Sequence, residues 1–152
     1  MPAAKREDGA VLVEFALVLP LLLLVVLGTM QFGIFLNAKI NETHLASSAA
    51  RYAAVNHNPT GGSLQDHIKS LGGTQYLRDN AQVCIEYLDG DDGNADAGDP
   101  GDPVTATVTA TYSLIPFLDN ALDDTPASVT VQGDATMRLE TFPDDIPQGC
   151  SA

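Results

Sequence analysis

A long apolar segment near the N-terminus places the strongest constraint on how this chain can fold. From Phe15 to Met30 the sequence reads FALVLPLLLLVVLGTM, and beyond the polar residue Gln31 the apolar run continues to Leu36. About 20 consecutive apolar residues are enough for a helix to cross the hydrocarbon core of a bilayer. We therefore expect residues 10–36 to form a transmembrane helix in contact with the lipid bilayer.

One acidic residue, Glu14, lies at the start of this segment, shortly after Gly9. Placing a carboxylate at the edge of a bilayer costs on the order of 2–3 kcal/mol, so Glu14 is a candidate functional residue whose partner should be identified. Cleavage after Gly9 would give Ala10 a free amine one helical turn from Glu14, on the same helix face. The sequence thus predicts a precursor with a leader of residues 1–9. The alternative is that Glu14 is a passenger whose side chain reaches the lipid headgroups.

The distribution of basic residues predicts the orientation of the segment. Lys5 and Arg6 precede it, whereas Lys39 and Arg51 are the basic residues that follow closely. The positive-inside rule then favours a cytoplasmic N-terminus and an exported domain of residues 37–152. A secretory signal peptide that is removed entirely is less favoured, because the apolar core exceeds the usual length of about 7–15 residues and no small-x-small cleavage site follows it promptly.

The charge balance argues against nucleic-acid binding. Seven basic residues oppose twenty acidic ones, which gives a net charge of −13. Phosphate recognition needs clustered Lys and Arg, and the sequence has no such cluster. We interpret the acidity as a solubilising surface rather than as a charged binding surface.

The two cysteines, Cys84 and Cys150, both fall in the expected exported domain. Disulfides persist in exported proteins, and an even cysteine count favours one bridge between the two. Such a bridge would fix the C-terminal tail to the body of the domain. The alternative is two free thiols, and metal binding is disfavoured because no residue near either cysteine has ligand spacing.

We expect one helix to begin near Ala10 and to continue well past the apolar segment. Pro20 removes one backbone donor and is expected to kink or locally unwind it. Beyond Met30, apolar residues recur at spacings of three and four up to Ala53, which predicts a single buried stripe. The segment from Asn56 to Gly62 contains the residue types that end a helix.

A short second helix is expected over SLQDHIKSL, with Ser63 as its N-cap. Alternation of apolar and polar residues then predicts strands over residues 82–87, 104–112 and 128–140, and Gly133 in the last strand suggests a β-bulge. Helices followed by a run of strands indicate an α+β fold. In this fold an antiparallel sheet packs on the C-terminal half of the long N-terminal helix.

Residues 88–103 form a turn-rich acidic loop between the first two expected strands. Its carboxylates are ligands that calcium prefers, but the Gly and Glu positions of the EF-hand pattern are not matched. We therefore expect a solvated loop and no cofactor. If calcium binds, its candidate ligands are Asp89, Asp91, Asp92, Asp96 and Asp99.

The sequence contains none of the motifs that mark common catalytic sites. It has no nucleophile elbow, no glycine-rich phosphate loop and no paired metal motif. His44, His57 and His67 are too scattered to define a metal site. We therefore do not expect an enzyme.

The N-terminal sequence GAVLVEFALVLPLLLLVVLGTMQFG resembles the TadE-like minor pilins (pseudopilins) of tight-adherence (Tad, Flp-type) pilus systems. Like type IV pilins, these proteins have a leader that ends in Gly, and a Glu at the fifth mature position followed by an aromatic residue. Gly9, Glu14 and Phe15 match this arrangement, and Pro20 adds to it. The segments TATVTATYSLIPFL and SVTVQGDATMRLE are similar to the paired strands that close many members. The acidic loop and the two cysteines lie outside the resemblance.

The resemblance implies a type IV pilin-like fold and cleavage between Gly9 and Ala10 by a prepilin peptidase at the cytoplasmic membrane face. It implies that Glu14, beside Phe15, meets an N-terminal amine of an adjacent subunit. The implied partners are the peptidase, other pilins or pseudopilins, and the inner-membrane assembly platform. The implied location is the bacterial cytoplasmic (inner) membrane, from which the subunit takes part in assembly or adhesion of a pilus.

Two other readings remain open at the level of sequence. The chain could be an uncleaved, membrane-anchored binding or adhesion domain outside the cytoplasm. It could also be a major pilus subunit, but major subunits of these systems are typically much shorter. The identity of the first residue of the working protein separates a processed subunit from an anchored domain.

Overall fold

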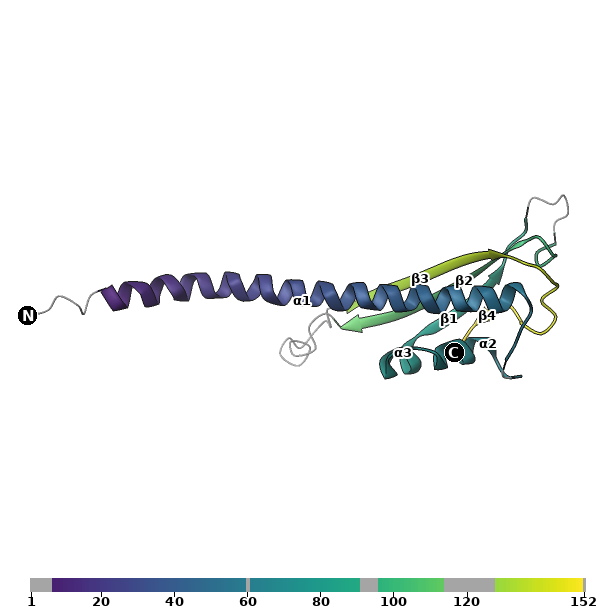
Figure 1. Cartoon of the computed structure of the whole chain (residues 1–152), viewed down its shortest axis with the longest axis horizontal. Coiled ribbons are helices and arrows are strands. Elements are labelled where there is room, and N and C mark those ends of the chain that lie inside the picture. Colours follow the sequence, from purple (N-terminus) through teal and green to yellow (C-terminus); the bar gives the residue numbers. More distant parts are fainter. Residues whose placement is uncertain (1–6, 60, 91–95, 114–127, 152) are drawn as a thin grey trace, which may run out of the picture. The chain divides into compact units, whose positions relative to one another are not determined.

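Helix α1 is one α-helix of 48 residues, Glu7–Ala54, in the computed structural model (Figure 1). The chain divides into two compact units, residues 1–36 and residues 37–152, and α1 contributes to both. The structure describes residues 7–59, 61–90, 96–113 and 128–151. The expected connection over residues 114–127 lies outside this part of the chain.

The N-terminal part of α1 differs from the predicted helix in two respects. The helix begins at Glu7 rather than near Ala10, because acidic residues are favoured in the first turn, where the helix dipole is positive. The helix also continues through Pro20 without interruption, so the predicted local unwinding is wrong. Proline removes a single backbone donor, and the hydrogen bonds on either side of it can remain.

The C-terminal end of α1 is closed by Asn56, as the sequence indicated. Asn56 has a left-handed backbone with φ of 46°. Its N–H donates to the carbonyl of Ala53 at 3.1 Å, and the N–H of His57 donates to the carbonyl of Tyr52 at 2.9 Å. This pair of bonds is the Schellman arrangement, which satisfies carbonyls that the helix end leaves unpaired.

Two short helices follow. In α2, Leu64–Ser70, the predicted N-cap is confirmed, because the Ser63 hydroxyl accepts the Asp66 N–H at 3.4 Å. Helix α3, Gln75–Asn80, was not assigned from the sequence, and Thr74 caps it by accepting the Leu77 N–H at 3.2 Å. A helix of six residues shows too little periodicity to be recognised from sequence alone.

The sheet confirms the three predicted strands and adds a fourth. Its strands are β1 (Gln82–Tyr87), β2 (Pro103–Ser113), β3 (Ser128–Arg138) and β4 (Gly149–Cys150). Every neighbouring pair is antiparallel, and the order across the sheet is β3-β2-β1-β4. Strand β4 has only two residues, which is too short for an alternating pattern to reveal.

The sheet packs on residues 37–54 of α1 through small side chains. The inward face of β2 is fully buried at Val104, Ala106 and Val108. The helix meets the sheet core with an alanine-rich stripe. Because alanine has a short side chain, the helix and the sheet can approach closely. The expected α+β fold is therefore confirmed, and the residues of the stripe are Ala46, Ala49, Ala50, Ala53 and Ala54.

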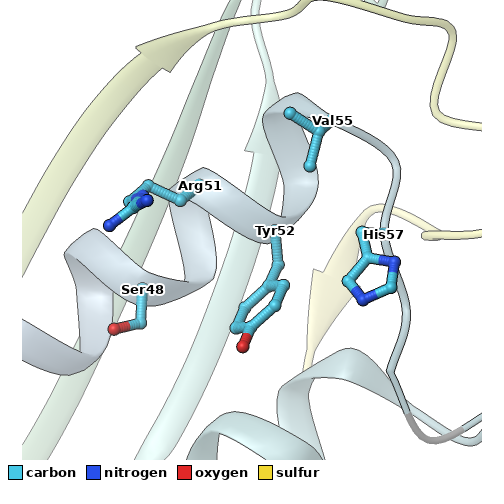
Figure 2. A pocket seen from close by; sticks show the side chains of 5 residues that line it. All are labelled: Ser48, Arg51, Tyr52, Val55 and His57. Carbon is cyan, nitrogen blue, oxygen red and sulfur yellow. The ribbon is translucent and has the colours of Figure 1, made fainter.

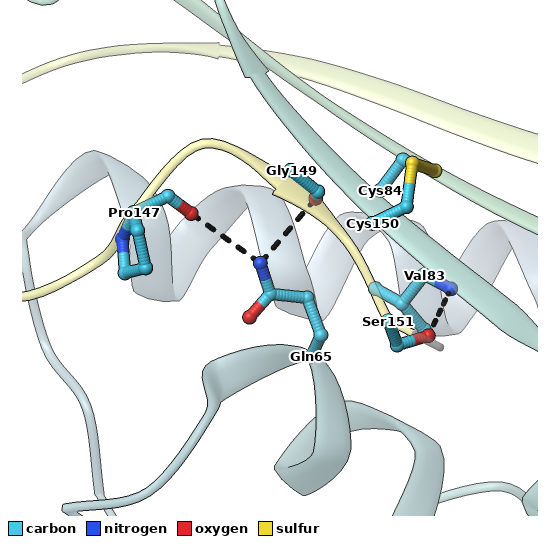
Figure 3. The surroundings of a disulfide bond; sticks show 7 residues. All are labelled: Gln65, Val83, Cys84, Pro147, Gly149, Cys150 and Ser151. Carbon is cyan, nitrogen blue, oxygen red and sulfur yellow. Dashed lines mark hydrogen bonds between the residues drawn. A yellow bond between two sulfur atoms is a disulfide. The ribbon is translucent and has the colours of Figure 1, made fainter.

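The C-terminal tail is joined to the sheet by the Cys84–Cys150 disulfide (Figure 3). The two cysteines are directly opposite each other on β1 and β4. Next to them, Ser151 pairs with Val83: its hydroxyl accepts the Val83 N–H at 3.0 Å, and its own N–H donates to the Val83 carbonyl at 2.8 Å. The Gln65 amide adds longer bonds to the carbonyls of Pro147 and Gly149. The bridge thus fixes the tail, as the cysteine count predicted.

Gly133 has a different role from the predicted β-bulge. Strands β2 and β3 pair in continuous register, with Val108 opposite Gly133, so there is no bulge and that prediction is wrong. A Cβ atom at Gly133 would lie 2.4 Å from the backbone carbon of Glu42 and 2.4 Å from the nitrogen of Thr43. Glycine is therefore required here because the backbone of α1 passes directly over the strand.

Replacing Gly133 with alanine should displace α1 from β3. The added methyl would meet backbone atoms, which cannot rotate away, and overpacking of this kind costs roughly 1–3 kcal/mol. We expect Gly133→Ala to lower the free energy of unfolding by at least that amount, measured by chemical denaturation of the full chain in detergent.

Gly73→Ala is the matched control for this prediction. A Cβ atom at Gly73 would be an ordinary 3.8 Å from the Asn41 side chain. Its effect on the free energy of unfolding should be small or favourable, since alanine restricts the unfolded chain. Equal stability of the two variants would contradict the role assigned to Gly133.

Candidate functional site

The residues of the expected cleavage and assembly site occupy the first turns of α1. Gly9 and Ala10 are exposed helical residues, and no atom lies within 4 Å of the position that a Cβ of Gly9 would take. Ala10 and Glu14 are four residues apart, so they lie on one face of the helix. Phe15 is 60% exposed and lies next to Glu14 in the sequence. Gly9, Ala10 and Phe15 are therefore exposed to the surroundings of the chain.

The apolar part of α1 is largely exposed in the part of the chain that the structure describes. Most of its large apolar side chains are exposed, Leu17 to 75% and Leu24 to 69%. Among the described residues, one helix is long and apolar enough to cross a membrane, and it spans Gly9–Ala54. A helix that is apolar on all sides requires an apolar surrounding such as lipid or other apolar helices. Membrane anchoring through this segment is consistent with that requirement.

The base of the acidic loop is organised by a residue that the sequence did not single out. Asp102 is 1% exposed, and its carboxylate accepts three backbone N–H groups. One oxygen accepts from Gly90 at 3.0 Å, and the other accepts from Gly98 at 3.0 Å and from Asp99 at 2.9 Å. A buried carboxylate is stable when its charge is met by several such donors. Asp102 therefore holds the two ends of the loop together.

The predicted calcium ligands do not form a recognisable site in the part of the loop that the structure describes. Asp91 and Asp92 lie outside the described residues. Of the others, Asp89 and Asp96 are exposed, and Asp99 is partly buried. Within the described ranges, no group of three or more His, Cys, Asp or Glu side chains could hold a metal ion.

A second buried acid, Glu42, lies where α1 passes over β3. Its side chain is 0% exposed. Neither of its carboxylate oxygens has a hydrogen-bond partner among the residues that the structure describes, and the same holds for the hydroxyl of Tyr112. The two groups interact, although their geometry falls short of a regular hydrogen bond.

The surroundings of Glu42 favour its protonated form. Burial raises the pKa of Glu42 to about 7, and the Tyr112 hydroxyl and the charge of Lys39 offset only part of this effect. Burial together with the nearby charge of Glu42 also raises the pKa of Tyr112 above its ordinary value. Glu42 lies beyond residues 10–36, in the part of α1 that belongs to the unit of residues 37–152.

A shallow pocket of about 310 Å³ lies beside the end of α1 and is lined by Ser48, Arg51, Tyr52, Val55 and His57 (Figure 2). The Tyr52 ring has a histidine on each side, with ring centroids 5.8 Å from His57 and 5.8 Å from His67. These contacts bring together two of the three histidines that are far apart in the sequence. His57 lies tilted against the Tyr52 ring and His67 meets it edge-on, so these contacts pack the residues after α1 against α2.

Sequence reasoning missed both Asp102 and Glu42. Asp102 was read as one more acid of a solvated loop, and its position immediately before Pro103 gave no sign of burial. Glu42 had one available signal: it lies four residues after Ala38 and three before Leu45, which places it on the apolar stripe. An acid on the buried face of a helix is a marker of an unusual environment.

Replacing Asp102 with asparagine should loosen the base of the acidic loop. Asparagine offers one acceptor oxygen, and its NH2 group would face backbone donors. Unsatisfied buried donors of this kind cost about 1–3 kcal/mol. We expect Asp102→Asn to lower the free energy of unfolding by that amount, whereas Asp89→Asn, an exposed change in the same loop, should have little effect. Wild-type stability in Asp102→Asn would show that the three bonds do not hold the loop.

Comparison with known proteins finds a family match for the N-terminal part of the chain. The model of a family described as TadE-like protein matches residues 9–51. No curated protein and no solved structure matches the chain. The matched segment contains Gly9, Glu14, Phe15 and Pro20, and it ends before the first strand of the sheet. Over residues 9–51, this chain is therefore similar to TadE-like proteins, in agreement with the resemblance of its N-terminal sequence.

Proposed function

We propose that this chain is a minor pilin subunit of a Tad (Flp-type) pilus, matured by a prepilin peptidase that cleaves between Gly9 and Ala10. One observation carries the proposal: the TadE-like segment coincides with an exposed apolar helix whose first turns contain Gly9, Ala10 and Glu14. The proposed function is assembly or adhesion, without catalysis by the chain itself.

Cleavage would create the partner that Glu14 lacks. The new amine of Ala10 is a cation, and a cation and a carboxylate in lipid are each unfavourable alone but compensate one another as a pair. Within one helix, Ala10 and Glu14 are a turn apart. Between two parallel helices, the amine of one subunit can approach Glu14 of the next, and this pairing would select one axial register during assembly.

The position of Gly9 in α1 is compatible with processing. The first N–H groups of a helix have no intrahelical partner, so the first turn opens at low cost. Gly9 and Ala10 lie in this region, and their surroundings in the chain are open. A peptidase could therefore bind the segment in an extended form without disturbing the rest of α1.

The exported unit would then be presented outside the cytoplasmic membrane. Its disulfide suits an oxidising compartment, and its sheet packs on the exported part of α1. We infer that the membrane part of α1 contacts lipid before assembly and the helices of other pilins or pseudopilins, or of the assembly platform, afterwards.

The N-terminus of the working protein tests the proposal. In cells with an active pilus system, mass spectrometry of the purified protein should find Ala10 as the first residue. Deleting the peptidase gene should restore residues 1–9. A protein that keeps its leader while the pilus system is active would instead be a membrane-anchored domain that is not processed.

Replacing Glu14 with glutamine tests the pairing mechanism separately. The change keeps the shape of the side chain but leaves the amine without its counter-charge, and breaking a buried ion pair in this way costs about 3–5 kcal/mol. We expect leader removal to persist and incorporation into pili to fall at least tenfold, measured by immunoblot of sheared pili. Gln31→Ala, which alters another polar residue of the same helix, should incorporate normally. Normal incorporation of Glu14→Gln would rule out the charge pair.

A further inference from the structure

Glu42 stands out among the acidic residues because its burial is not compensated. Asp102 is as deeply buried, but three backbone donors meet its charge. Glu42 is 0% exposed, and no described residue forms a hydrogen bond with either of its oxygens. A buried ionised carboxylate without donors is strongly unfavourable, so the neutral acid is the form that fits this position.

The charged and titratable groups around Glu42 do not alter this conclusion. On α1 the nearest is Lys39, whose ammonium group donates to the carbonyl of Gln132. On β2 it is Tyr112, whose ring stacks on Tyr76 of α3 with centroids 5.2 Å apart. Strand β3 presents Gly133 at this point, and the side chains on either side of it, Gln132 and Asp134, are exposed on the opposite face.

At Gly133, the part of α1 that carries Glu42 lies directly on β3. The backbone of Glu42 and Thr43 lies against Gly133 so closely that even a methyl group would not fit between them. Because Glu42 is fully buried in the docked state, its ionised carboxylate gains hydration when this part of α1 moves away from β3. Loss of the proton is therefore coupled to separation of the helix from the strand.

We propose that Glu42 is a proton-controlled latch that holds the exported part of α1 on the β2–β3 hairpin, firm while its carboxyl is protonated and weakened when the proton is lost. This inference concerns the exported unit alone and does not rest on the proposed pilus function.

The direction of the pH effect follows from the pKa of Glu42, which is about 7 in the docked state. The separated state should have the ordinary Glu pKa of about 4.3. Below that value both states hold the proton, and docking has its full strength. Between about 4.3 and 7 only the docked state holds it, so each rise in pH weakens docking. Above 7 both states are ionised, and the dependence ends.

Hydrogen–deuterium exchange of the full chain in detergent tests the latch. After correction for intrinsic rates, the opening constant of amides in residues 37–54 should rise by roughly tenfold per pH unit between about pH 5 and 7, and then level off. In Glu42→Gln this slope should largely disappear. Glu86→Gln, which removes an exposed charge from β1, should keep the wild-type slope. A full slope in Glu42→Gln, or none in the wild type, would overturn the proposal.

A second measurement applies even if Glu42→Gln fails to fold. The chain has five glutamates, whose side-chain carboxyl carbons can be labelled with ¹³C and titrated by NMR. One resonance should titrate near pH 7 and move to higher pH in Tyr112→Phe, because the Tyr112 hydroxyl lowers the pKa of Glu42. If the titration of every glutamate resonance is the same in the wild type and in Tyr112→Phe, the latch is refuted.

Discussion

Close contact between the exported part of α1 and the sheet is the constraint on which the rest of this domain depends. The helix meets β2 through alanines and crosses β3 at Gly133, where the two backbones leave no room for a side chain. Close packing of this kind tolerates little change in volume. Glu42 lies at this same contact and is fully buried, so the packing of α1 on the sheet bears on both the architecture and the chemistry of residues 37–152.

The same helix meets two different surroundings along its length. In residues 10–36 apolar side chains cover every face and are exposed, which requires lipid or other apolar helices as the environment. In residues 37–54 only one stripe is buried, and it faces the sheet.

Two buried acids show how a fold decides the state of similar side chains. Asp102 receives three backbone donors, from Gly90, Gly98 and Asp99, so both of its side-chain oxygens are hydrogen-bonded. Burial raises the pKa of Glu42 to about 7, and the Tyr112 hydroxyl and the charge of Lys39 offset only part of this rise. Asp102 stabilises a loop, whereas the charge of Glu42 is expected to change with pH near neutrality. For a third acid, Glu14, the proposed partner is the N-terminal amine that cleavage after Gly9 would create.

Local patterns in the sequence determined much of this protein. Several elements depend only on neighbouring residues, and the α+β fold follows from their order. These elements are the apolar run, the Ser63 cap, the helix end at Asn56 and the alternating strands 82–87, 104–112 and 128–140. The motif around Gly9 and Glu14 is equally local. Only the tertiary structure decided the roles of Gly133, Asp102 and Glu42, because each depends on groups distant in the chain. Gly133 depends on the backbone of α1, Asp102 on both ends of a loop, and Glu42 on its burial beside Tyr112.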